Sequence, residues 1–206
     1  DNNLMIQKLG KEVITIIYLF CGISLLVFII DIFYLIQYSN NKSYVLDDSL
    51  SFVYFMYTML YWAFLLGTIW FVHKSQLYNF ERGVKDLKYS PTWVGIWWFI
   101  PFLNLWMPFK VVKETYLSSF QVKKTKLDIH GYNNLWSWWG SWVLAMIIPV
   151  INNSITRIQY SLDTSASLEN ALAADILATF FIISAALSFI TIIKSISANE
   201  IITIKE

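Results

Sequence analysis

The chain has 206 residues, of which 57% are hydrophobic and only 14% are charged, and its formal net charge at pH 7 is +1. Ordinary soluble domains carry roughly 25% charged residues, so this composition is that of an integral membrane protein. The balanced charge gives no basic field for nucleic acid, and the single cysteine, Cys21, excludes an intramolecular disulfide and a multi-cysteine metal site.

Five apolar runs follow one another along the sequence, and together they predict a single polytopic membrane domain over residues 1–206. A helix needs about 20 residues to cross a hydrocarbon layer of roughly 30 Å. The first, second and fifth runs meet that length easily, whereas the fourth is near the lower limit and the third contains a central proline. The runs cover residues 13–36, 52–72, 93–109, 135–151 and 172–193.

The third run lies in a tryptophan-rich stretch, SPTWVGIWWFIPFLNLWMPF, which contains Pro101, Asn104 and Pro108. A proline inside a helix removes an intrahelical hydrogen bond and clashes with the preceding turn. Each half of the run is then about 12 Å long at 1.5 Å per residue, which reaches roughly to the bilayer midplane. The run therefore forms either a re-entrant segment, which leaves the membrane on the side where it entered, or a fully crossing, kinked helix.

The distribution of lysine and arginine favours the re-entrant segment. If all five runs cross and the amino terminus is inside, 7 basic residues lie inside and 8 outside. If the third run returns to its own side, 13 lie inside and only Lys42 and Arg157 lie outside. Short cytoplasmic loops are enriched in basic residues, so we expect four spanning helices with both termini cytoplasmic. The four helices should enclose the broken segment, because irregular backbone at membrane depth needs protein or water around it.

The sequences that flank this segment have the pattern of amphipathic helices. Residues 74–88 and residues 109–120 both place apolar side chains at spacings of three and four. We expect both to lie in the cytoplasmic interface, where they would anchor the broken segment and bind anionic headgroups. The predicted fold is therefore all-α, with four transmembrane helices, a proline-broken segment and two interfacial helices.

Two side-chain stripes mark the second and fifth runs. Tyr54, Tyr57 and Tyr61 share one face of the second run, and small residues such as Ala178 and Ala185 fall near one face of the fifth. Small residues allow close helix approach in a membrane, and tyrosine hydroxyls need partners in a dry bundle. Structural packing explains both stripes, and a permeation path lined by tyrosines is the alternative.

Ionisable residues inside the predicted spans are few. Asp31 lies near the end of the first run and Asp175 near the start of the fifth, so the predicted topology places both at similar depth near the outer face. Arg157 is the nearest cation in the sequence. Because such groups are costly in a membrane and are usually paired, we hypothesise a polar cluster of Asp31, Arg157 and Asp175. The alternative is that the carboxylates reach water at the helix ends.

Nothing in the sequence predicts enzyme chemistry. His73 and His130 have no carboxylate or cysteine at metal-ligand spacing, and no strained nucleophile turn can be identified. Glu114 and Asp128 are expected to be solvated. We therefore expect a protein that is not an enzyme and that uses neither a metal nor a cofactor.

The stretch TIWFVHKSQLYNFERGVKDLKYSPTWVGIWWFIPFLNLWMPFKVVKETYLSS, followed by LWSWWGSW, resembles the bacterial membrane proteins grouped as domain of unknown function 4328. The resemblance covers residues 52–193. His73 and Lys74 depart from it, because the family pattern has an arginine-rich exit from the span there. The matching positions are Trp70, Asn79, Ser90, Pro91, Trp93, Trp98, Pro101, Asn104, Leu105, Pro108, Trp136, Trp138 and Trp139.

This resemblance implies the fold, a bacterial inner-membrane location and the place of a functional core, but it brings no known activity, cofactor or substrate. The implied core consists of Asn79, Pro91, Trp93, Trp98, Pro101, Asn104 and Pro108.

Two functions remain open. The first is a non-enzymatic subunit or scaffold of a membrane complex, in contact with lipid and with other membrane subunits or a second copy. The second is a small oligomeric channel or transporter, gated by the re-entrant segment around Pro101 and Asn104. A water-accessible cavity that reaches Asn104 would favour the second function.

Overall fold

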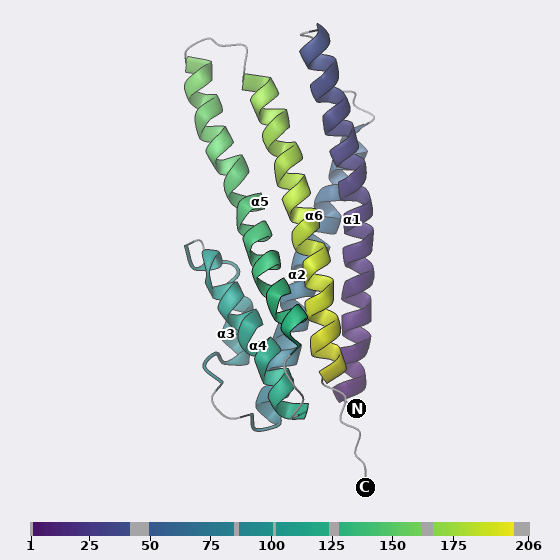
Figure 1. Ribbon diagram of the computed structural model, residues 1–206, viewed down its shortest axis with the longest axis vertical. Coiled ribbons are helices and arrows are strands. Elements are labelled where there is room, and N and C mark those ends of the chain that lie inside the picture. Colours follow the sequence, from purple (N-terminus) through teal and green to yellow (C-terminus); the bar gives the residue numbers. More distant parts are fainter. Residues whose placement is uncertain are drawn as a thin grey trace.

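The computed structural model describes residues 2–41, 50–84, 87–100, 102–123, 128–161 and 167–199 (Figure 1). Within these ranges the chain is almost entirely helical and contains no strand, which confirms the predicted all-α fold. The elements are α1 (Asn2–Asn41), α2 (Ser51–Glu81), α3 (Pro91–Ile96), η2 (Phe102–Leu105), α4 (Met107–Lys123), α5 (Ile129–Ser161) and α6 (Ser167–Asn199).

Four of these helices are long and apolar enough to cross a membrane, as predicted, and the protein is therefore a membrane protein. The suitable portions are Leu4–Asn40, Ser51–Glu81, Gly131–Ile155 and Glu169–Asn199. The helices continue well beyond the apolar runs. At 1.5 Å per residue, the 40 residues of α1 extend over about 60 Å, which is longer than a hydrocarbon layer of roughly 30 Å.

The helix α6 lies at the centre of the arrangement. It packs along α5 on one side and α1 on the other, and α1 packs along α2 (Figure 1). The backbones of α2 and α5 stay apart over the described residues. The rings of Tyr61 and Phe64 on α2 reach across to Trp142 on α5. The order of the spans is therefore α2, α1, α6, α5, and the first and last leave a space between them.

A hairpin made of α3, η2 and α4 occupies this space in one half of the bundle, the half that contains the start of α1 and the end of α6 (Figure 1). We call it the termini half, and the other the distal half. In the hairpin, α3 packs on α2, while α4 contacts α2, α5 and α6. Both ends of the hairpin lie at the termini end, so it does not form a fifth helix along the bundle. Its entry into a bilayer stays a prediction.

The four spans enclose the hairpin on one side only, which differs from the expectation of full enclosure. Trp98, Val111 and Val112 are buried against the bundle. At the hairpin tip, by contrast, Phe99 and Phe102 are largely exposed, the latter at 80%. The tip therefore presents aromatic side chains away from the protein.

The helix α2 ends in a way that corrects the prediction of a separate helix over residues 74–88. Its last residue is Glu81, and Gly83 follows with φ +69°, a conformation that favours glycine. The amide of Gly83 donates to the Phe80 carbonyl (3.0 Å) and that of Val84 to the Asn79 carbonyl (3.2 Å). This is a Schellman motif, which terminates the helix. The second predicted amphipathic helix, residues 109–120, does lie within a helix, α4.

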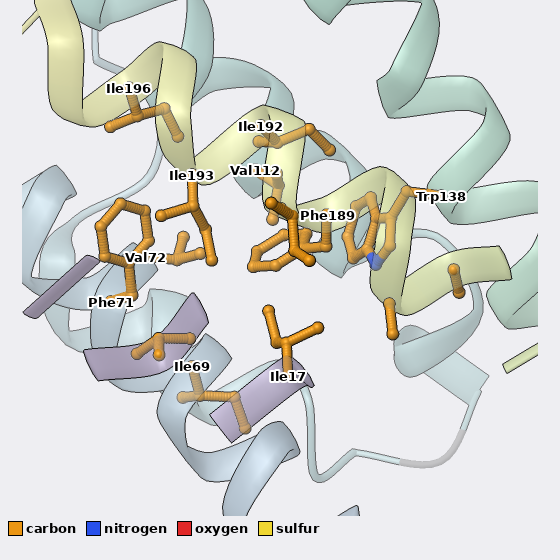
Figure 2. Close-up of a cluster of buried hydrophobic side chains, with 14 of the residues drawn as sticks. Ile17, Ile69, Phe71, Val72, Val112, Trp138, Phe189, Ile192, Ile193 and Ile196 are labelled. Carbon is orange, nitrogen blue, oxygen red and sulfur yellow. The ribbon is translucent and has the colours of Figure 1, made fainter. Parts of the chain in front are cut away.

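The hydrophobic core is concentrated in the termini half. Figure 2 shows side chains from five helices converging there, with Ile193 of α6 among Ile17 of α1, Val72 of α2 and Val112 of α4, and with Phe189 beside Trp138 of α5. All of these are buried, and the rings of Trp138 and Phe189 are 5.2 Å apart. The hairpin thus completes a core to which every span contributes.

Candidate functional site

A cavity of ≈ 790 Å³ lies in the distal half, between α1, α2, α5 and α6. Most of its wall is apolar and includes Val27, Leu172 and Ile182. A largely apolar wall with a few convergent polar groups is typical of a small-molecule site. The polar lining residues are Asp31, Ser51, Tyr54, Tyr57, Tyr61, Asp175 and Thr179.

Two carboxylates from different helices face this cavity. Asp31 of α1 is only 5% exposed, although it lies within the span Leu4–Asn40. The Tyr54 hydroxyl donates a hydrogen bond of 2.7 Å to its Oδ1. Asp175 of α6 lies close enough to Asp31 for the two charges to interact. The structure therefore brings together two of the three residues of the hypothesised cluster.

The third, Arg157, lies on α5 two helical turns beyond Pro149, which lines the cavity. Its side chain is outside the described part of the structure. An ion pair between Arg157 and the two carboxylates stays a prediction.

The predicted tyrosine stripe of α2 forms one wall of the cavity. Tyr57 lies close to Thr179 of α6, and both residues line the cavity. The ring of Tyr61 stacks on Trp142 of α5, with centroids 6.4 Å apart and an interplanar angle of 11°. Both rings are thus held in place by residues of neighbouring helices.

A proline of α5 lies in the wall of the cavity as well. Pro149 lies inside the helix and has no N–H to donate to the carbonyl of Ala145, four residues earlier. Both residues line the cavity. The Ala145 carbonyl is therefore left without its helical donor beside a space that also holds two carboxylates.

The residues of the implied functional core lie elsewhere, at the hairpin. Trp98 is buried between Trp138 and Trp142 of α5, with centroids 6.2 and 6.1 Å away. Trp93 is exposed and stacks on Trp97 at 5.0 Å. The tryptophan-rich sequence thus forms an aromatic cluster that joins the hairpin to α5.

The prolines of the core mark helix starts. Pro91 is the first residue of α3, and its carbonyl accepts a hydrogen bond of 2.8 Å from the His73 Nδ1 of α2. Pro108 is the buried second residue of α4, a position where the missing N–H costs little. Pro101 lies outside the described residues.

The two asparagines of the core have unpaired side chains within the described structure. Asn79 is fully buried on α2, and neither its Oδ1 nor its Nδ2 has a hydrogen-bond partner there. The same holds for Oδ1 of the half-buried Asn104. Neither asparagine lines the distal cavity.

The carboxylate of Glu114 on α4 accepts several hydrogen bonds that the sequence pattern does not predict. Instead of being solvated, its carboxylate accepts hydrogen bonds from Gln76 Nε2 (2.8 Å) and from the backbone amides of Lys88 (3.0 Å) and Tyr89 (3.1 Å). Thr115 donates to the Oε1 of the same Gln76. Glu114 thereby fastens the chain after α2 to α4. It follows a lysine in an apparently solvated helix, so no sequence signal distinguished it.

Asp128 is also held by protein groups and not solvated as expected. Its carbonyl accepts a hydrogen bond from the Tyr116 hydroxyl (2.9 Å), and its Oδ2 accepts one from Ser195 (3.0 Å). Burial, aided by the negative charge of Asp128, raises the pKa of Tyr116 to about 12. The hydroxyl therefore stays protonated at neutral pH and keeps its role as donor.

Within the described residues, no group of three or more histidine, cysteine, aspartate or glutamate side chains could hold a metal ion.

Comparisons with curated proteins and with solved structures give no match. The sequence does match the family described as domain of unknown function (DUF4328), over residues 43–198. That range contains α2, the hairpin, α5 and nearly all of α6, and it leaves out α1 with Asp31. Because the match covers more than half of the chain and agrees with the resemblance seen in the hairpin sequence, the protein belongs to the DUF4328 family.

Proposed function

We propose that this protein is a non-enzymatic carrier that takes a small solute into the distal cavity. The observation that supports the proposal is the pair of carboxylates, Asp31 and Asp175, beside a cavity of ≈ 790 Å³ within the spanning helices. Ionisable groups inside a membrane are costly, and they usually mark a path for ions or substrates. A helix pair held together only for packing has no need of two acidic groups at one place.

The proposed location is the bacterial inner membrane, with both termini in the cytoplasm. Of the 15 basic residues, 13 would then lie on the cytoplasmic side, in agreement with the positive-inside rule. The distal half is the outer half in this orientation, so solute would enter the cavity from outside the cell. The hairpin would lie in the inner leaflet, with the exposed rings of Phe99 and Phe102 in contact with lipid.

A gate around Pro101 and Asn104 is not part of this proposal. The described residues that line the cavity come from α1, α2, α5 and α6, and none of these belongs to the hairpin. The hairpin instead closes the termini half, which would leave the carrier open on the outer side.

A thiol-accessibility experiment tests the carrier. Ala178 lines the cavity, whereas Ala186, two turns further along the same helix, is fully buried in the core. In a Cys21→Ala background, each is replaced by cysteine, and intact cells are treated with a membrane-impermeant, uncharged maleimide. We expect Ala178→Cys to react at least tenfold faster than Ala186→Cys. Equal, slow labelling of the two would contradict a solute cavity open to the outside.

A role as a subunit is the second candidate, and a feature of α5 favours it. Leu144, Ile147, Ile151 and Ile155 are exposed at spacings of three and four, so they form an apolar stripe along one face. Such a stripe fits another membrane subunit or a second copy of this chain, although lipid covers it equally well. Purification in a mild detergent distinguishes a subunit from a carrier, because a subunit retains a stoichiometric partner and an autonomous carrier does not.

A further inference from the structure

We propose that the solute of the distal cavity is an organic cation, with an ammonium group held between Asp31 and Asp175 and an apolar body in the rest of the cavity. This inference rests on the proposed carrier function and names the class of solute. Three features of the cavity carry it: the charge of its lining, the acceptors and rings that it presents, and its size.

The charge of the lining is negative. Asp31 and Asp175 interact across it, and no lysine, arginine or histidine is among its described lining residues. Two neighbouring carboxylates disfavour each other's ionisation unless a cation lies nearby. The Tyr54 hydroxyl donates to Oδ1 of Asp31 and brings no positive charge. A bound cation would supply the opposite charge that the described protein groups lack.

The groups around the carboxylates match the donors of an ammonium ion. A primary ammonium has three N–H donors and no acceptor. The cavity offers two carboxylates, and its wall includes Ala145, whose carbonyl Pro149 deprives of its helical donor. Tyr57 and Tyr61 also line the cavity, with one face of each ring stacked on Phe20 or Trp142, and a cation within about 6 Å of a ring centroid is stabilised by the ring.

The size and polarity of the cavity favour an organic cation over a metal ion. Mg²⁺ and Ca²⁺ take about six to eight oxygen ligands at 2.0–2.6 Å, in a compact shell. Here the cavity has a volume of ≈ 790 Å³, and residues such as Val27, Leu172 and Ile182 supply an apolar surface. An apolar body would bury that surface while the charged end stays at the carboxylates.

The ammonium group could belong to a free amine or to a phospholipid headgroup, and vesicle composition separates these sources. The Ala178→Cys variant, in the Cys21→Ala background, is reconstituted in vesicles of phosphatidylglycerol, which has no ammonium group. The maleimide labelling rate is then measured with n-hexylammonium, n-hexanol or n-hexanoate, which have similar size and differ in charge. A second arm replaces half of the lipid by phosphatidylethanolamine and adds no amine.

Slower labelling with n-hexylammonium alone supports a free amine, and slower labelling with phosphatidylethanolamine supports a lipid ammonium. Equal protection by all three hexyl compounds overturns the inference, because the cavity would then bind apolar chains regardless of charge. Rapid labelling without any protection also overturns it, while leaving the carrier intact. An absence of labelling in every condition instead contradicts the carrier itself. Ala145→Cys, on α5, repeats the test at a second lining position.

Neutralising the carboxylates tests their role directly. Asp31→Asn and Asp175→Asn should each raise the half-protecting concentration of n-hexylammonium at least tenfold, which corresponds to about 1.4 kcal/mol. The matched control is Glu12→Gln, an exposed acid at the other end of α1, which should leave that concentration unchanged. Unchanged protection in both aspartate variants overturns the assignment. Arg157→Gln should not weaken protection, and a loss of protection in it would likewise overturn the assignment.

Discussion

The termini half and the distal half of the bundle contain the same four spans but are filled differently. In the termini half, the hairpin packs between α2 and α5 and completes a core around Ile193 (Figure 2). In the distal half no described element takes the hairpin's place, and a cavity of ≈ 790 Å³ lies among the same spans. The hairpin therefore fills one half of the bundle, and the half without it contains the cavity.

The polar groups follow the same division. Glu114 and Asp128 in the termini half accept hydrogen bonds from neighbouring residues and fasten loops to helices. Asp31 and Asp175 in the distal half instead face a cavity. Acidic side chains thus fasten protein segments together in one half and line a cavity in the other, where Asp31 also accepts a hydrogen bond from Tyr54. Substitutions that compare the two halves can test this difference.

The largest expected effect compares two isoleucines of α6. Ile193 is fully buried in the termini half, whereas Ile182 lines the distal cavity. Truncation of a buried isoleucine leaves a void, so Ile193→Ala should lower the free energy of unfolding by about 3 kcal/mol. Ile182 is buried too but borders the cavity, so Ile182→Ala should cost about 2 kcal/mol, the low end of the range for isoleucine-to-alanine changes. The free energy of unfolding of each variant is measured in mixed micelles with an increasing fraction of dodecyl sulfate.

This pair shares a residue type, a helix and a substitution, so differences in helix propensity cancel. Equal losses for the two variants would mean that the distal half is packed as tightly as the termini half. The contrast between the halves would then be wrong.

A smaller effect is expected at the hairpin. Glu114→Ala leaves Gln76 and the amides of Lys88 and Tyr89 without their acceptor. Hydrogen bonds to a charged group contribute about 1.5–3 kcal/mol, so we expect a loss of about 2 kcal/mol. Hydrogen exchange should also become faster at the amides of Lys88 and Tyr89. Lys113→Ala, the neighbouring change, removes a half-buried cation that lies over the rings of Phe109 and Tyr132, and it should leave those amides protected because Lys113 makes no hydrogen bond to them.

Much of the fold could be predicted because its signals are local. The length and hydropathy of the apolar runs predict the four spans. The distribution of the basic residues predicts that the proline-broken segment returns to the termini end. The shared depth of Asp31 and Asp175 followed from their positions near the ends of their runs. Each of these inferences needs only distances along the chain.

The cavity and the hydrogen bonds of Glu114 could not be predicted from the sequence, because both depend on which helices are neighbours. The cavity exists because α2 and α5 stay apart, which the sequence does not encode in any one segment. Tyr57 and Asp175 are more than 100 residues apart, and only the order of the spans brings them to one wall. The end of α2 differs from the prediction. The apolar spacing continues past Gly83, but the positive φ of this residue ends the helix.

The smallest expected effect compares two glycines of α1. At Gly10 an added Cβ would lie 2.6 Å from Ser197 Oγ, 3.2 Å from Ile193 Cγ2 and 3.3 Å from Phe71 Cε2. At Gly22 it would meet nothing within 4 Å. Alanine favours a helix over glycine by about 1 kcal/mol, and overpacking costs about 1–3 kcal/mol. Gly10→Ala should therefore lower the free energy of unfolding by about 1 kcal/mol.

Gly22→Ala, in contrast, gains the helix propensity without the clash and should leave the free energy of unfolding unchanged or slightly higher. The hydroxyl of Ser197 can rotate away from a new methyl group, but Ile193 and Phe71 are fixed in the core, so the clash at Gly10 cannot be relieved fully. If both substitutions stabilised the protein in the same micelle titration, α1 would have room to move in the termini half. The close contact of α1, α2 and α6 there would then not be what closes that end of the bundle.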